Sequence, residues 1–317
     1  MKSALNAPEL RDEAAAFAYV EARLWPNGAT CPHCGVVGEA SRSTGKTTRM
    51  GLWNCRACRK PFTVRMGTLF ESSHVPLHIW LQVMYLVCSS KKGISTRQIQ
   101  RTIGGSMKTA WFLGHRIREA MAEGSLPPLG GAGGDVEADE TFYGHDANYS
   151  AKGGKNMNAV LSLVDRESGQ VRSMVLGNVT ANAVTRAVAS NVAVDTRLLT
   201  DASNAYHRVG GMLADHQSVN HSKHEYVRKG DATVHTNTVE GTFSIFKRGM
   251  RGIYQHCAAK HLPRYLAEFD FRYSNRFALG IGDKARADIA LAGVVGKRLT
   301  YETVSARRAG EETRIVW

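Results

Sequence analysis

Residues 135–144 read DVEADETFYG and show the alternation of a β-strand. Val136 and Ala138 fall on one side of the expected strand, and Glu137 and Asp139 fall on the other. An aspartate in the middle of a strand is unfavourable unless its face is solvated or holds a cation. This stretch therefore predicts both the first strand of a sheet and a functional carboxylate at Asp139.

The chain that follows alternates between strand and helix patterns. NAVLSLVDRESGQVRSMVLGNV (158–179) predicts two strands around a turn, and TANAVTRAVASNV (180–192) predicts a helix capped by Thr180. TRLLTDAS (196–203) predicts a short buried strand that ends in Asp201. Strand, strand, strand, helix, strand, helix is the order of a ribonuclease H-like core, an α/β fold with a mixed five-stranded sheet. Periodicity alone also allows other α/β arrangements.

A further helix is expected from Thr238 in the stretch HTNTVEGTFSIFKRG (235–249). Its apolar stripe contains Val239, Phe243, Phe246 and Met250. Its polar stripe contains Asn237, Glu240, Ser244, Lys247 and Arg251. The preceding HSKHEYVRKGDATVHTN (221–237) contains an HxxH pair, but without a further ligand at defined spacing a polar connecting segment is favoured over a metal site.

The expected topology would bring together three acidic residues that are far apart in the sequence. In a ribonuclease H-like sheet the first and fourth strands are neighbours, so Asp139 and Asp201 would meet, and a helix packed across them would add Glu240. Oxygen ligands suit Mg²⁺ or Mn²⁺ rather than zinc. Two such ions ~3.5–4 Å apart can activate a water or a DNA 3′-hydroxyl and stabilise the leaving oxygen. The pattern therefore predicts phosphodiester cleavage and transfer, with Lys247 directed toward phosphate.

Four cysteines form two CxxC pairs, CPHC (31–34) and CRAC (55–58). This spacing predicts a zinc ribbon whose tetrahedral, structural site is completed by Cys31, Cys34, Cys55 and Cys58. His33 is expected to be a bystander, and the isolated Cys88 and Cys257 are expected to be small buried apolar residues. The basic residues expected to contact DNA from the ribbon are Arg49, Arg56, Arg59, Lys60 and Arg65.

A helix-turn-helix pattern follows the ribbon. After an amphipathic helix in LHIWLQVMYLVCSS (77–90), the stretch 93–121 predicts a helix capped by Ser95, a turn at Gly104-Gly105 and a second helix opening at Ser106. The second helix is expected to expose Lys108, Thr109 and Arg116 for DNA reading. A plain helical hairpin is the alternative.

Charge is distributed unevenly over the 317 residues, whose net charge is +13. Residues 1–130 hold 17 Lys and Arg against 8 Asp and Glu, and residues 241–317 hold 14 against 7, whereas residues 131–240 hold 10 against 13. Basic flanks around an acidic centre favour a phosphate backbone held beside bound cations, although solvated faces are the commoner cause of a basic balance. No membrane span or signal peptide is recognised, so a cytoplasmic protein is expected.

Several blocks resemble the zinc-ribbon-bearing DDE transposases of bacterial insertion sequences. These blocks are VEADETFYG, TDASNAY, VNHSKHEYV, VHTNTVEGTFSIFKRGMRGIY and HLPRYLAEFDFRYSNR, and the similarity extends from the ribbon to about Arg276. The resemblance implies metal-dependent cleavage at the ends of an element and strand transfer into a target. Asp139 and Asp201 match the first two acids of the family, and Lys247 matches its basic residue.

The third ligand of the family is either Glu or Asn, and this chain has both. Glu240 is favoured because a carboxylate offsets two cations better than an amide, which leaves Asn237 to cap the helix. Arg248 and Arg251 join Lys247 as expected DNA contacts. Glu140 is expected on the opposite face of the sheet, and Glu137 is a weaker alternative ligand on the face of Asp139.

The expected organisation runs through six segments. They are an N-terminal helical segment (1–26), the zinc ribbon (27–73), the helix-turn-helix region (74–125), a linker LPPLGGAGG within 126–134, the catalytic domain (135–278) and a basic tail (279–317). The expected partners are double-stranded DNA, as terminal inverted repeats and as target, and a second copy of the chain. A DNA-binding protein without catalysis and a nuclease without strand transfer are the alternatives.

Overall fold

The computed structural model describes all residues except 1–2, 123, 125, 145–156, 302–313 and 316–317. The chain divides into two compact units. The ribbon unit comprises residues 1–90, 94–121 and 282–317, and the sheet unit comprises residues 91–93 and 122–281. Among the described residues no helix is long and apolar enough to cross a membrane.

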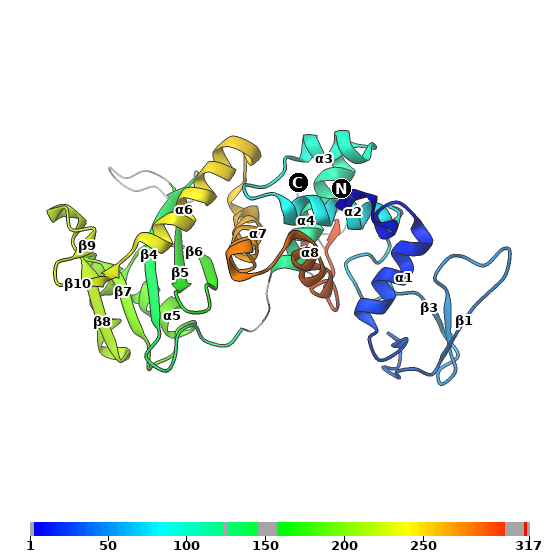
Figure 1. The fold of residues 1–317 in the computed structure, drawn as a ribbon, viewed down its shortest axis with the longest axis horizontal. Coiled ribbons are helices and arrows are strands. Elements are labelled where there is room, and N and C mark those ends of the chain that lie inside the picture. The colour runs from blue at the N-terminus through cyan, green and yellow to red at the C-terminus, as the bar shows by residue number, and fades with distance from the viewer. Residues whose placement is uncertain (1–2, 123, 125, 145–156, 302–313, 316–317) are drawn as a thin grey trace, which may run out of the picture. The chain divides into compact units, whose positions relative to one another are not determined.

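The ribbon unit combines five helices with a small antiparallel sheet in the described residues (Figure 1). Its helices are α1 (Glu13–Leu24), α2 (Leu77–Ser89), α3 (Thr96–Ile103), α4 (Met107–Met121) and α8 (Asp283–Ala292), with short 3-10 turns at Ala4–Asn6 and Pro8–Leu10. Its strands are β1 (Ala40–Arg42), β2 (Trp53–Cys55) and β3 (Pro61–Phe62), in the order β1-β2-β3, and the parallel pair β11 (Thr300–Tyr301) and β12 (Arg314–Ile315).

Helices α3 and α4 follow the sequence prediction closely. Ser95 Oγ accepts the Gln98 amide at 3.1 Å, which confirms the predicted cap, and Ser106 Oγ accepts the Thr109 amide at 3.0 Å before α4. The turn between the helices places Gly104 at φ 75°, where a side chain would be strained. The two-helix arrangement is thus present, and its role in reading DNA stays a prediction.

Helix α8 is packed into the ribbon unit, although residues 279–317 were expected to form only a basic tail. Ala290 and Leu291 are buried, and Arg286 Nη1 donates to the Cys88 carbonyl of α2 at 2.8 Å. The small alanine side chains of α8 allow it to approach α2 closely, and an alanine-rich sequence reveals no such partner in advance.

The sheet unit contains the predicted mixed five-stranded sheet. The strands are β4 (Asp135–Tyr143), β5 (Asn158–Asp165), β6 (Val171–Leu176), β7 (Arg197–Asp201) and β8 (Asp215–Val219). Their order is β6-β5-β4-β7-β8, antiparallel from β6 to β4 and parallel from β4 to β8. This is the ribonuclease H-like topology, so the expected fold class is confirmed.

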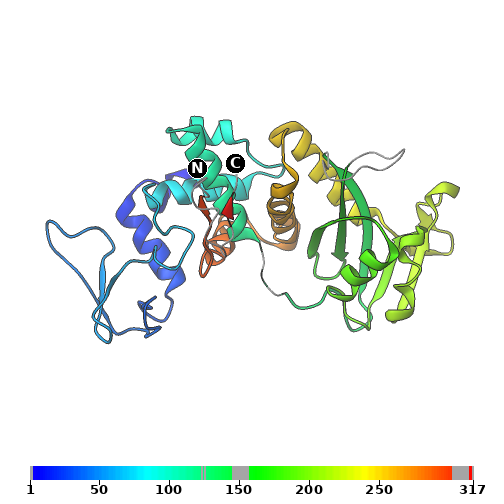
Figure 2. The same ribbon diagram turned by 180° about the vertical axis from the view of Figure 1, so that it is seen from behind.

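Three helices cover the two faces of this sheet. They are α5 (Ala181–Ala189), α6 (Asn237–Gly249) and α7 (Leu262–Ser274), with a π-helical turn at Met250–Tyr254 and short 3-10 turns at Asn204–Tyr206, Gly210–Met212, His221–Lys223, Ala259–His261 and Phe277–Leu279. Val184 and Val188 of α5 pack with Val136 and Ala138 of β4. Helices α6 and α7 cover the opposite face (Figure 2). Val239 of α6 packs there against Val164 of β5 and Val171 of β6.

Three segments of the sheet unit differ from expectation. Strand β8 (DHQSV) escaped prediction because it is an edge strand in which only Val219 is buried. The expected polar segment 221–237 contains a hairpin of β9 (Val227–Arg228) and β10 (Asp231–His235). The expected linker lies partly against the unit, since Leu129 is 4% exposed and exchanges backbone hydrogen bonds with Asn191 and Ala193.

Candidate functional site

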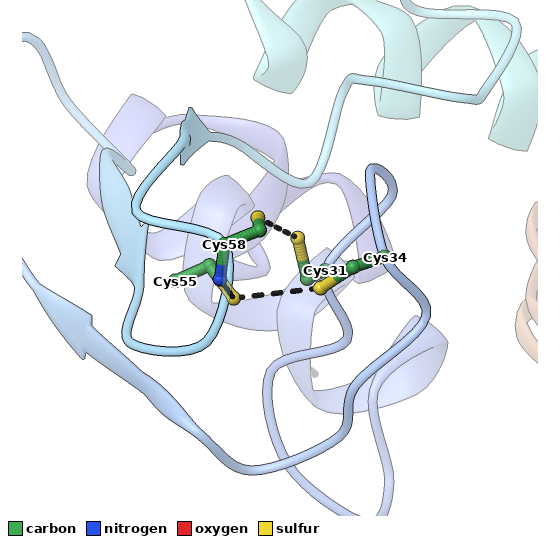
Figure 3. Close-up of side chains that lie close together, drawn as sticks. All are labelled: Cys31, Cys34, Cys55 and Cys58. Carbon is green, nitrogen blue, oxygen red and sulfur yellow. Dashed lines mark hydrogen bonds between the residues drawn. The ribbon is translucent and has the colours of Figure 1, made fainter.

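The four ribbon cysteines direct their sulfur atoms toward one another (Figure 3). Cys31 Sγ lies 3.7 Å from Cys58 Sγ, Cys34 Sγ lies 3.6 Å from Cys55 Sγ, and all four sulfurs lie within 4.8 Å of one another. Zn–S bonds of ~2.3 Å in a tetrahedron require sulfur separations of ~3.8 Å, so this set fits a structural zinc ion.

The surroundings of the cysteines suit a closed metal site. Cys31 and Cys55 are buried against Phe62, and Trp25 and Trp53 pack on the same cluster. Burial opposes ionisation of Cys31, but the amides of His33 and Cys34 hold the pKa of its thiol below its usual range. His33 is exposed and contacts the Pro61 carbonyl, which agrees with its expected role as a bystander.

Most of the expected DNA contacts are accessible. Arg49, Arg56, Arg59 and Lys60 of the ribbon are exposed, and so are Lys108, Arg248 and Arg251. Thr109 is half-buried, and its hydroxyl lies 3.0 Å from Ser106 Oγ. The exposed residues retain the charge needed to contact a phosphate backbone.

Two of the expected DNA contacts are internal instead. Arg65 pairs with Glu13 at 3.0 Å and donates to the carbonyls of Ser73 and Val75. Arg116 was expected on an exposed face of its helix, and this is wrong: it is 6% exposed and donates to the carbonyls of Leu69 and Leu299. Both guanidinium groups are used to satisfy buried backbone oxygens.

The register of the sheet sets Asp139 and Asp201 beside each other. Strands β4 and β7 are parallel, and Glu137 is level with Leu199. Two residues further along each strand come Asp139 and Asp201, on the same face because side chains alternate with a period of two. Both aspartates are half-buried.

Helix α6 adds Glu240 to the two aspartates. Its Oε1 accepts the Thr236 hydroxyl at 3.0 Å and lies 3.4 Å from His221 Nε2. Burial, together with repulsion by Asp201 and Glu240, raises the pKa of Asp139 to about 6. Asp201 and Glu240 therefore lie close enough to Asp139 to oppose the ionisation of its carboxyl group, an effect that a bound cation would relieve.

The carboxylate oxygens are more widely spaced than the ribbon sulfurs. Among the described residues, the four cysteines are the only group of three or more metal-binding side chains whose ligand atoms all lie within 4.8 Å. The oxygen donors nevertheless suit Mg²⁺ or Mn²⁺. Asp139, Asp201 and Glu240 would supply the oxygen ligands of such ions.

Asn237 takes a different place from the one expected. The N-cap position of α6 is Thr236, which makes no side-chain cap, and Asn237 is the exposed first residue of the helix. The interpretation of Asn237 as the cap is therefore wrong. The amide of Val239 is capped instead by Glu137 Oε2 of β4, at 2.8 Å.

The two other glutamates of β4 lie on opposite faces. Glu137 shares the face of Asp139 but is fully buried and occupied by ion pairing with Arg166, so it is not an open ligand. Glu140 is next to Tyr206, on the α5 side, as expected. Burial, together with repulsion by Asp139 and Asp201, raises the pKa of Glu140 to about 7.

His221 is a member of the site that sequence reasoning missed. It lies two residues after Val219, the last residue of β8, which is level with Asp201. Its imidazole lies beside Glu240 and Thr236 and acts electrostatically on Asp139. The only signal was the HxxH pair, which by itself favoured a connecting segment.

Lys247 lies two turns after Glu240 on α6. It is half-buried, and its Nζ lies 5.9 Å from the centre of the Phe243 ring. Phe243 packs on the sheet through Val164 and Val239. The ammonium group of Lys247 therefore lies along the side of the helix that carries Glu240.

Comparison with protein families shows the class of protein, a DDE-type transposase. Residues 131–274 match the ISXO2-like transposase domain, and residues 11–61 match the transposase zinc-ribbon domain. The chain belongs to the ISXO2-like transposases that carry a zinc ribbon.

A curated relative is similar over most of the chain. A protein of Halobacterium salinarum, described as an uncharacterized protein in transposable element ISH50, is 27% identical over 78% of this chain and 86% of its own length. Because that relative comes from an archaeon, a bacterial source for the present chain stays a prediction.

The catalytic core domain of BIV integrase is 16% identical and covers 43% of this chain and 82% of its own, with a TM-score of 0.29. A chain of a simian T-cell lymphotropic virus intasome in complex with a PP2A regulatory subunit is 15% identical. It covers 54% of this chain and 63% of its own length, with a TM-score of 0.28. The fold class rests on the strand order rather than on these similarities.

Proposed function

We propose that this transposase binds the terminal inverted repeats of its own insertion sequence and then cuts and joins DNA at Asp139, Asp201 and Glu240. The observation that carries the proposal is the placement of the two aspartates side by side on parallel strands, with Glu240 directed at them from α6. Neighbouring carboxylates repel one another, so such a group is typical of a functional site that binds a cation.

Asp139, Asp201 and Glu240 would hold two divalent ions, Mg²⁺ or Mn²⁺. Such ions, when bound, supply Lewis acidity and neutralise the charge of the reacting phosphate. The protein's own contribution is to fix the three carboxylates on rigid elements and to present Lys247 to a phosphate oxygen. His221, next to Glu240, is placed to orient that carboxylate.

DNA binding would come from basic residues outside the carboxylate site. Arg49, Arg56, Arg59 and Lys60 would hold the phosphate backbone from the ribbon, and Lys108 would do so from the start of α4. Arg248 and Arg251 would hold DNA next to Lys247. Two ends of the element must be held together before joining, so we infer at least a dimer on DNA.

The test is an in vitro joining reaction. Purified full-length protein is incubated with labelled element ends, a target plasmid and Mg²⁺, and the products are resolved on a gel. Joined products are expected. Cleavage without joining would favour a nuclease, and end binding without either product would favour a DNA-binding protein that lacks catalysis.

A further inference from the structure

A second carboxylate on the Asp139 face of β4 has a place in the site that metal binding does not explain. Glu137 is two residues before Asp139 and is fully buried, at 0% exposure. A buried carboxylate costs several kcal/mol unless it is paired and hydrogen-bonded. The hydrogen-bond and ion-pair partners of Glu137 therefore indicate what this buried carboxylate does.

Both oxygens of Glu137 are used to hold the first turn of α6. Oε2 accepts the amide of Val239 at 2.8 Å, and Oε1 accepts the hydroxyl of Thr238 at 2.7 Å. Thr236, at the N-cap position, makes no side-chain cap. A carboxylate from a neighbouring strand thus replaces the helix's own cap and also complements the positive end of the helix dipole.

Arg166 also holds the carboxylate of Glu137. Arg166 Nε donates to Glu137 Oε1 at 2.7 Å. The guanidinium also donates to the carbonyls of Thr233 and His235, at 2.5 and 2.9 Å, just before α6. Strand β4, the start of the β5–β6 turn and the segment entering α6 are therefore joined at one buried charge.

The position of Glu240 depends on this junction. Glu240 follows Val239 directly, so the bond from Glu137 to the Val239 amide fixes the height and rotation of the helical turn that presents Glu240 to Asp139. We propose that Glu137 is a positioning residue that sets the spacing of the proposed metal ligands. The inference rests on the proposed function, because it assigns Glu137 a part in cation binding at that site.

Glu137→Gln tests the proposal, with Glu268→Gln as the matched control. Glu268 of α7 is also 0% exposed and also paired with an arginine, Arg272. In Glu137→Gln the amide loses the charge and one acceptor. Thr238→Val removes a single bond to Glu137 and keeps the ion pair with Arg166, so it serves as a milder second variant.

The primary readout is Mn²⁺ binding to the full-length zinc-loaded protein without DNA, followed by the electron paramagnetic resonance signal of free Mn²⁺. Binding that Asp139→Asn removes defines the site. We expect Glu137→Gln to weaken that binding at least tenfold, Thr238→Val to weaken it about threefold, and Glu268→Gln to leave it within twofold. Melting temperatures are recorded for all variants.

Equal Mn²⁺ affinity in wild type, Glu137→Gln and Thr238→Val would overturn the positioning role while leaving the proposed function intact. A loss of melting temperature shared by Glu137→Gln and Glu268→Gln, with unchanged affinity in both, would also overturn it and leave Glu137 a purely structural residue. Absence of any Mn²⁺ binding that depends on Asp139 would overturn the proposed metal site itself, and this inference with it.

Discussion

The thiolates of the ribbon unit and the carboxylates of the sheet unit are assembled in opposite ways. Four sulfurs from two short turns already lie within 4.8 Å of one another and pack against aromatic side chains. The carboxylates come from two strands and a helix and are more widely spaced. Burial, together with repulsion by Asp201 and Glu240, raises the pKa of Asp139 to about 6.

The cysteine cluster is suited to a metal ion that stabilises the fold around it, whereas the proposed carboxylate site would depend on the fold to hold its ligands in place. The ribbon has too few residues for a large core and gains its stability from a closed shell of ligands. The sheet unit has a core of its own, and the raised pKa of Asp139 means that its ionised carboxylate lowers the stability of the metal-free unit. Breaking each site should therefore have opposite effects on stability.

The largest effect is expected from the ribbon. Cys55→Ser should remove the zinc and unfold the ribbon, because structural zinc contributes on the order of 10 kcal/mol to such folds. Metal analysis should show loss of zinc, and fluorescence should show exposure of Trp25 and Trp53, which pack beside the cysteines. Cys257→Ser is the control and should keep both signals; zinc retained in Cys55→Ser would contradict the four-cysteine site.

The second effect falls on chemistry rather than folding. Asp139→Asn or Asp201→Asn should lower the rate of strand joining at least about 10³-fold, because each removes a charged ligand from the proposed metal site. End binding, measured by gel shift, should stay within twofold. Glu167→Gln, at an exposed turn of the same unit, is the control. A variant of either aspartate that still joins DNA would remove that residue from the site.

A third comparison separates the two residues one turn apart on α6. Glu240→Gln should abolish joining, whereas Asn237→Ala should keep it within about threefold, because Asn237 is exposed and Glu137 caps the helix in its place. The same joining assay measures both. Reversed outcomes would make Asn237 the third ligand.

The smallest effect is on stability and depends on pH. The pKa of Asp139 is raised from 3.8 to about 6 in the folded state, so its ionised form destabilises the metal-free fold as pH rises through 6. Asp139→Asn should therefore stabilise the metal-free sheet unit by about 1–2 kcal/mol at pH 7.5 and by much less at pH 4.5. Hydrogen exchange of peptides from β4 and β7 measures this; a mutant that is less stable at pH 7.5 would contradict it.

Local sequence predicted local features well. The CxxC pairs predicted the ribbon, alternation predicted β4, and two apolar runs around a turn predicted β5 and β6. The caps at Ser95 and Thr180 are present as expected. Within each CxxC pair, strand and cap, the residues that set the pattern lie within a few positions of one another. Spacing along the chain is then almost the same information as distance in space.

Contacts between residues far apart in the sequence could not be predicted in the same way. Arg116 carries a charge typical of an exposed DNA contact, yet carbonyls far away in the chain bury it. Glu137 had the pattern of a possible ligand, and only the approach of α6 shows that it caps a helix. His221 is brought to the site by β8. This polar edge strand has almost no hydrophobic periodicity, so the sequence did not predict it.

The central claim, that Asp139, Asp201 and Glu240 converge on one cation site, is tested most directly by iron-mediated cleavage of the polypeptide. Fe²⁺ replaces Mg²⁺ in the full-length protein, ascorbate and peroxide generate hydroxyl radicals at the metal, and mass spectrometry maps the broken peptide bonds. Cuts are predicted near residues 139, 201 and 240, all suppressed together by excess Mg²⁺. Cuts missing from any one of these three segments, or insensitive to Mg²⁺, would contradict the account.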